Sequence, residues 1–336
     1  MQPFRFFLAA LFFPALLCLT LPARAQDNSQ YKPQAIRISV DRVSVGVIVT
    51  DARGHFLEGL HREDFHIFDN GAEQSLSDFV AVDEPAQVLL LIEAGPAVYL
   101  LEGGHLQAAL ALLNGLSPGD RVAVVKYADS PQAMLDFTPD KQAAAAAFGQ
   151  LRFNLGFGSL NLSSSVSKVL EWLASVQGKK MIVLLSTGVD TSPSNESGLV
   201  IQQLKTSDVR LLAVSLTGGL QNPQPGSKKK SPIKTSAQTA RQFEEADRLL
   251  KRMAESTGGR AYFPVSSAEF NSVYAEIAQL VRHEYSLAFA PPARDGLVHS
   301  VEVRVDIPPT PASNGPAVSY RIDHRHAYLA PLPAKP

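Results

Sequence analysis

The chain has 336 residues and a formal net charge of −1. This length is enough for two or three domains with a full hydrophobic core. Because positive and negative charges nearly cancel, no global basic field points to nucleic acid or to an acidic membrane surface. Cys18 is the only cysteine, which excludes a disulfide framework and a thiolate metal site.

The first 25 residues have the three parts of a secretory signal peptide. Arg5 supplies a weak positive charge, an apolar run extends from Phe6 to Leu21, and Ala23-Arg24-Ala25 matches the A-x-A cleavage pattern. The alternative, an uncleaved membrane anchor, is less favoured because the apolar run is short for a span. We therefore expect a secreted or periplasmic protein that starts near Gln26 and has no stable membrane span after cleavage.

A small antiparallel β unit is predicted over residues 36–84, after a polar and flexible N-terminus at 26–35. Apolar side chains alternate with polar ones along its first half, at Ile36, Ile38, Val40, Val43, Val45, Val47 and Val49. A period of two is typical of half-buried strands. Asp69-Asn70-Gly71 predicts a hairpin, because Asn-Gly accepts positive φ angles.

Between residues 85 and 282 the pattern changes to buried strands that alternate with helices. The apolar runs of predicted strands are Val88–Ile92, Arg121–Tyr127, Lys180–Leu185 and Val209–Leu216. Helical patterns cover 105–116, 140–152, 161–176, 196–206, 237–256 and 267–282. Such alternation predicts right-handed βαβ units, a parallel sheet and flanking helices. Residues 219–236, which include Lys228-Lys229-Lys230, are expected to form an exposed, mobile insert.

The β pattern returns after the last predicted helix. Three strands are expected at 283–290, 298–306 and 317–323. Together they make residues 283–336 a C-terminal β extension and tail. The predicted fold class is therefore α/β, with small β units at both ends of the core.

Several sequence motifs along this order point to one family. The motifs are Ile67-Phe68-Asp69-Asn70-Gly71, Pro118-Gly119-Asp120-Arg121-Val122, Lys179-Lys180-Met181-Ile182-Val183-Leu184-Leu185-Ser186-Thr187-Gly188 and Tyr285-Ser286-Leu287. Over roughly residues 36–328 the chain resembles the secreted von Willebrand factor A-related proteins that are abundant in Acidobacteria. The resemblance implies a Rossmann-like von Willebrand factor A core and a role in protein binding or cell adhesion, not catalysis.

The resemblance also implies a metal-ion-dependent adhesion site, and this chain departs from it in all three contributing loops. The corresponding positions are Glu93, Gly95, Ala97, Ser159, Ser186 and Thr187. The family has Asp-x-Ser-x-Ser at the first three and an aspartate in place of Thr187, while Ser159 corresponds to the second-loop threonine. Hard cations prefer carboxylate and hydroxyl oxygens, and Gly95 and Ala97 have none. We expect these loops to bind a ligand through a degenerate site that has no cofactor and shows weak or absent binding of Mg²⁺ or Mn²⁺.

Two other patterns in the sequence have chemical meaning. Gly115-Leu116-Ser117-Pro118-Gly119 matches G-x-S-x-G, but a nucleophile elbow must follow a strand and open a helix, and this segment does the reverse. His324 and His326 are a possible metal pair without an evident third ligand. We therefore assign no catalytic residue and expect the protein not to be an enzyme.

The favoured function is a protein-binding or adhesion module that works outside the cytoplasm. Its protein ligand, of unknown identity, would lie across the carboxyl ends of the parallel strands. The loops there are 93–104, 154–163 and 186–195. The alternatives are a structural component of an envelope assembly that uses its β units for pairing, and a hydrolase, which would still need a nucleophile and its base.

Overall fold

The computed structural model describes residues 42–82, 84–95, 110–151, 158–193, 195–221, 237–307 and 319–333. The predicted signal peptide at 1–25 and the N-terminus at 26–35 lie outside these residues. So do Ala97 and residues 222–236 of the predicted insert, whose first three residues belong to a short helix, α6 (Thr217–Gln221).

A six-stranded sheet forms the centre of the α/β part, in the order β10-β9-β8-β5-β6-β7. Its strands are β5 (Ala86–Glu93), β6 (Arg121–Tyr127), β7 (Pro131–Thr138), β8 (Lys179–Ser186), β9 (Val209–Ser215) and β10 (Ala261–Tyr262). All pairs are parallel except β6 with β7. The predicted parallel sheet is thus confirmed, and β7 is an antiparallel edge strand that the sequence pattern did not indicate.

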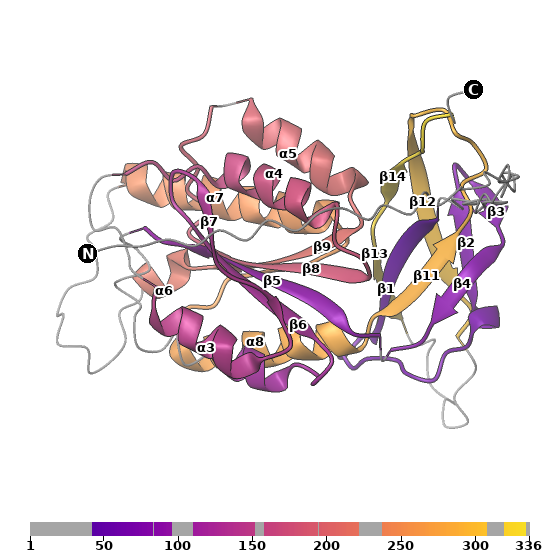
Figure 1. Cartoon of the computed structure of the whole chain (residues 1–336), viewed down its shortest axis with the longest axis horizontal. Helices are drawn as coiled ribbons and strands as arrows, with labels where there is room; N and C mark the ends of the chain where they lie inside the picture. Colours follow the sequence, from indigo (N-terminus) through magenta and orange to yellow (C-terminus); the bar gives the residue numbers. More distant parts are fainter. Residues whose placement is uncertain are drawn as a thin grey trace, which may run out of the picture. The chain divides into compact units, whose positions relative to one another are not determined.

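Helices cover both faces of this sheet (Figure 1). Their bounds are α3 (Lys141–Gly149), α4 (Leu162–Leu173), α5 (Glu196–Thr206), α7 (Ala237–Ser256) and α8 (Ser267–Arg282). Val88, Leu90 and Ile92 of β5 pack with α3 and α8, whereas Leu89 and Leu91 pack with α4, α5 and α7. Each fully buried side chain of this kind stabilises the fold by about 1.5–3 kcal/mol. In the described part of the chain, no helix combines the length and apolar character needed to cross a membrane.

The remaining strands form two antiparallel four-stranded sheets, in the orders β13-β1-β11-β4 and β14-β12-β2-β3. Their bounds are β1 (Val43–Asp51), β2 (Phe65–Asp69), β3 (Ala72–Gln74), β4 (Leu76–Val80), β11 (Tyr285–Phe289), β12 (Val298–Val305), β13 (Tyr320–His324) and β14 (Ala327–Leu329). The predicted Asp69-Asn70-Gly71 hairpin is present, with φ angles of 47° at Asn70 and 82° at Gly71.

These sheets join the two β regions that the sequence pattern suggested as separate units. β1 pairs with β11 on one side and with β13 on the other, and β2 pairs with β12. The N-terminal strands bury their apolar face only when the C-terminal strands complete the core, in which Val45, Ile67, Leu287 and Val303 pack together. Residues from both ends of the sequence therefore build one β-strand part.

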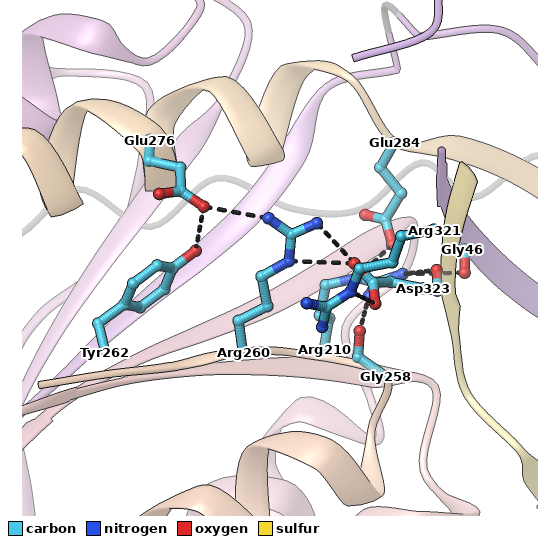
Figure 2. A network of polar contacts seen from close by, with 9 residues as sticks. All are labelled: Gly46, Arg210, Gly258, Arg260, Tyr262, Glu276, Glu284, Arg321 and Asp323. Carbon is cyan, nitrogen blue, oxygen red and sulfur yellow. Dashed lines mark hydrogen bonds and ion pairs between the residues drawn. The ribbon is translucent and has the colours of Figure 1, made fainter. Parts of the chain in front are cut away.

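A buried ion pair connects the β-strand part to the amino end of strand β9 (Figure 2). Arg210 Nε lies 2.7 Å from Glu284 Oε1, and both side chains are only 4% exposed. The same guanidinium donates to the carbonyl oxygens of Gly46 at 2.9 Å, Asp323 at 3.3 Å and Gly258. Arg210 therefore ties β9, β1, β13 and the segment after α7 together.

A second arginine extends this network. Arg260 donates to Asp323 Oδ2 from Nη2 at 2.6 Å and from Nε at 3.0 Å, and to Glu276 Oε1 from Nη1 at 3.1 Å. The Tyr262 hydroxyl donates to the same Glu276 oxygen at 3.0 Å. We call the nine residues labelled in Figure 2 the junction network. Position 46 has no room for a side chain, because a Cβ there would lie 1.9 Å from Glu284 Oε1.

Candidate functional site

The polar side chains of greatest interest lie where the parallel strands end. Glu93 is the last residue of β5, Tyr127 of β6 and Ser186 of β8. These strands are neighbours in the sheet, with β5 between β6 and β8. Because the carboxyl ends of parallel strands meet at one edge, the three side chains and the following Thr187 converge there. We call these four residues the edge cluster.

The Glu93 carboxyl is the centre of the edge cluster and is fully buried. Its Oε2 accepts hydrogen bonds from the Thr187 backbone N–H at 2.7 Å, the Thr187 hydroxyl at 2.8 Å and the Ser186 hydroxyl at 3.0 Å. Its Oε1 is buried and has no hydrogen-bond partner among the described residues. Burial raises the pKa of Glu93, and the hydrogen bonds from Thr187 and Ser186 oppose this rise.

Tyr127 supports the cluster from β6. Its hydroxyl lies 2.6 Å from Ser186 Oγ and 3.4 Å from Glu93 Oε2. Ser186 has one hydroxyl hydrogen, which it donates to Glu93, so Tyr127 donates to Ser186. Burial raises the pKa of Tyr127 well above its ordinary value, and the charge of Glu93 adds to this rise. The phenol is therefore a fixed neutral donor.

Contacts with α7 and with α4 fix the conformation of the loop after β8. Gly188 has a φ of 73°, and a Cβ there would lie 2.5 Å from the Ala246 carbonyl oxygen of α7. Its N–H donates to Ser186 Oγ at 2.8 Å. Two residues further on, Asp190 accepts from the Ser163 N–H at 3.2 Å and from the Ser163 hydroxyl. Asp190 thus caps the amino end of α4.

The comparisons with known proteins agree with this architecture. The model of the von Willebrand factor type A domain family matches residues 105–276, about half of the chain. The chain belongs to this family. The predicted fold class is therefore confirmed, by the family match and by the mostly parallel sheet.

Curated relatives of this A domain are remote. A UPF0353 protein of Mycobacterium marinum is 24% identical over 190 residues, which cover 53% of this chain and 53% of that protein. A UPF0353 protein of Mycobacterium ulcerans is 23% identical over the same length, with the same coverage. The chain thus spans about half the length of the curated relatives it matches.

The chain is also similar to several solved structures. A von Willebrand factor type A protein from Catenulispora acidiphila is 11% identical, with 80% of this chain and 74% of that chain covered and a TM-score of 0.47. An aerotolerance-related membrane protein from Bacteroides fragilis is 14% identical, with 58% and 98% covered and a TM-score of 0.45. The corresponding domain of the type V pili tip protein Mfa5 from Porphyromonas gingivalis is 11% identical, with 60% and 96% covered and a TM-score of 0.42.

The donor set at the edge of this A domain does not fit a divalent cation. The side chain that lies against Gly95 is Leu160, whose Cδ2 is 3.1 Å from the position a Cβ on Gly95 would take. Glu93 Oε1 is 3.2 Å from that same position, so the leucine side chain and the free carboxylate oxygen together leave little room for a side chain at Gly95. Ser159, the predicted second-loop hydroxyl, is exposed. Within the described ranges, no group of three or more His, Cys, Asp or Glu side chains could hold a metal ion.

The structure therefore brings Glu93, Ser186 and Thr187 together, with Gly95 beside them. Leu160, Tyr127 and Asp190 are further residues of this edge that sequence reasoning missed. Tyr127 could have been found, because it ends a predicted strand beside Glu93. Leu160 and Asp190 depend on how two loops meet, which no spacing in the sequence shows.

A second polar cluster lies at the end of the next strand along the edge. Asp247 of α7 accepts from the Ser215 hydroxyl at 2.6 Å and from the Thr217 hydroxyl at 3.0 Å. Burial raises the pKa of Asp247, against the effect of these two hydrogen bonds. This cluster links α7 to the end of β9, and its hydrogen bonds join Asp247 to Ser215 and Thr217, not to the Glu93 carboxyl.

The other candidate residues have structural partners. The N–H of Ser117 in the G-x-S-x-G segment donates to the buried Asp120 in a turn before β6. His324 is buried, its Nδ1 lies 2.7 Å from the Arg325 carbonyl oxygen, and its Nε2 accepts from the Val303 N–H at 3.4 Å. His326 meets it edge to face, with ring centroids 4.6 Å apart. Because both nitrogens of His324 have partners, the pair is not arranged to share a metal.

Proposed function

We propose that this protein is an adhesion-type, protein-binding module that works outside the cytoplasm and binds its ligand without a divalent cation. The observation that carries the proposal is that Glu93 Oε2 already accepts hydrogen bonds from Ser186 and Thr187. Export is supported by the signal-peptide pattern of residues 1–25. The resemblance to secreted Acidobacterial proteins supports the same location.

The binding surface we propose is the edge of the A domain formed by loops 93–104, 154–163 and 186–195. In the described part of the third loop, Thr191 and Pro193 are exposed. Thr191 is fixed to Leu160 by two hydrogen bonds of 2.8 Å, one to its hydroxyl and one from its backbone N–H. A loop that is ordered before binding loses less conformational entropy when a partner docks. The proposal includes no catalytic step.

A capture experiment tests this function. The mature chain is immobilised, incubated with envelope extract of the source organism in EDTA, and cross-linked. A three-loop variant carries Tyr99→Glu, Phe157→Glu and Pro193→Glu, and Ser272→Glu on the exposed face of α8 is the matched control. We expect the wild-type and control proteins to capture the same partner and the three-loop variant to lose it.

Two results would contradict this proposal. Capture that requires Mg²⁺ or Mn²⁺ would show that the site depends on a cation. Equal capture by the three-loop variant would move the contact to another surface, as expected for a structural component that pairs through its β strands.

A further inference from the structure

We propose that the Glu93 side chain replaces the cation as the mechanical link between the loops at the edge of this A domain. In an intact site of the family, an ion gathers oxygen ligands from three loops. Here one protein side chain makes the connection between the end of β5 and the loop after β8. The inference deepens the proposed function and rests on its premise that this edge is the binding surface.

The length of the glutamate side chain makes this link possible. β5 and β8 are adjacent parallel strands, with Ile92 opposite Leu185, and neighbouring strands lie about 4.8 Å apart. Glu93 crosses that gap and reaches the Thr187 N–H at 2.7 Å. An aspartate is shorter by one carbon–carbon bond, about 1.5 Å, so its carboxylate would stop short of hydrogen-bonding distance.

The chemistry of the contacts favours a direct link over a metal-mediated one. The shortest contact to Glu93 Oε2 comes from a backbone N–H of Thr187, which can donate a hydrogen bond but cannot coordinate a cation. The hydroxyls of Ser186 and Thr187 donate to the same oxygen. These three donors occupy the carboxyl oxygen that an ion would otherwise coordinate.

The second loop, which carries Leu160, is attached by an apolar contact and by hydrogen bonds with Thr191. Leu160 lies against Gly95, next to Glu93 Oε1. Its own N–H donates to the Thr191 hydroxyl at 2.8 Å, and its carbonyl oxygen accepts from the Thr191 N–H at 2.8 Å. Residues 93–95, 160 and 187–191 are therefore connected to one another by protein groups alone.

Amide hydrogen exchange of the purified full chain tests this inference without any partner. In Glu93→Ala we expect the amides of Thr187, Gly188 and Val189 to exchange at least about tenfold faster than in the wild type, because their link to β5 is lost. In Glu93→Gln, whose amide oxygen still accepts, the increase should be smaller. The matched control is Asp247→Asn, which alters a half-buried carboxyl of the same edge and should leave these three amides unchanged.

Added Mn²⁺ distinguishes the two kinds of link. We expect it to change exchange in none of these proteins. Unchanged exchange of the loop amides in both Glu93 variants would overturn the inference, and so would protection that appears only with Mn²⁺. Because the measurement needs no ligand, it stands even if the capture experiment fails.

Discussion

Two buried glutamates lie at opposite ends of the same parallel sheet, and the protein neutralises them differently. Glu284, at the junction with the β-strand part, forms an ion pair of 2.7 Å with the buried Arg210. Glu93, at the carboxyl edge, accepts from neutral groups, namely the Ser186 hydroxyl, the Thr187 hydroxyl and the Thr187 N–H, with the Tyr127 hydroxyl further away at 3.4 Å.

The difference separates a structural contact at the junction from the edge that we propose binds the protein ligand. A buried ion pair has strict geometry, and loss of either partner leaves an uncompensated charge. The junction network therefore fits a rigid contact between the α/β part and the β-strand part. Neutral donors on a loop hold a carboxylate less strongly than a buried guanidinium does.

The largest effect is expected at the junction. Arg210→Ala removes the partner of Glu284 and should lower the free energy of unfolding by about 3–5 kcal/mol, measured by urea denaturation. Arg321→Ala is the control, because this guanidinium is 62% exposed where it pairs with Asp323. Its loss should cost at most about 1 kcal/mol. Equal effects of the two substitutions would show that burial of the pair does not matter.

A smaller effect is expected at the edge. Glu93→Ala leaves the three donors of Ser186 and Thr187 without their acceptor and should lower the free energy of unfolding by about 2 kcal/mol. Glu93→Gln should cost less, because its amide oxygen keeps part of the acceptor role. The same denaturation series measures both. If Glu93→Ala lowers the free energy of unfolding as much as Arg210→Ala does, the proposed difference between the junction and the edge is wrong.

The sequence predicted the sheet well and the edge only in part. Strands β5, β8 and β9 have continuous apolar runs, and their positions were predicted correctly. Strand β7 was missed because it is a partly exposed edge strand whose register with β6 shifts twice. The pairing of β1 with β11 and β13 was missed because it joins residues that lie more than two hundred positions apart.

At the edge, strand ends were predictable and loop contacts were not. Glu93, Ser186 and Thr187 follow from the ends of strands, which the apolar runs locate. Ser159 and Leu160 are neighbours in one loop, and only the tertiary structure shows that the leucine lies against Gly95. The missing oxygen ligands, a hydroxyl at Gly95 and a carboxylate at Thr187, are visible in the sequence, whereas the contact of Leu160 with Gly95 is not.

A buried histidine in the β-strand part predicts a modest pH dependence. His299 Nε2 lies 3.1 Å from Asp295 and Nδ1 lies 2.9 Å from Asp69. The hydrogen bond with Asp295, and then that with Asp69, raise the pKa of His299 above its ordinary 6.5. Its stabilisation should be fully present below pH 6.5 and be lost as the pH rises through the higher folded-state pKa.

The measurement for His299 is the free energy of unfolding between pH 5 and 9 for the wild type and His299→Gln. The wild-type protein should lose more stability than the variant on going to alkaline pH. Parallel curves would show that His299 is not charged in the folded protein. The Glu73→Gln variant, which changes an exposed partner of His66, controls for the other histidine contacts of this part.

The most direct test of the central claim is a calorimetric titration of the wild-type chain with Mn²⁺ and Mg²⁺. A variant with Glu93→Asp, Gly95→Ser, Ala97→Ser, Leu160→Thr and Thr187→Asp is the positive control, because it restores oxygen donors in all three loops. We expect micromolar binding by this variant, weaker binding when Leu160 is kept, and none by the wild type. Micromolar Mn²⁺ affinity in the wild type that disappears in Glu93→Ala would contradict the account.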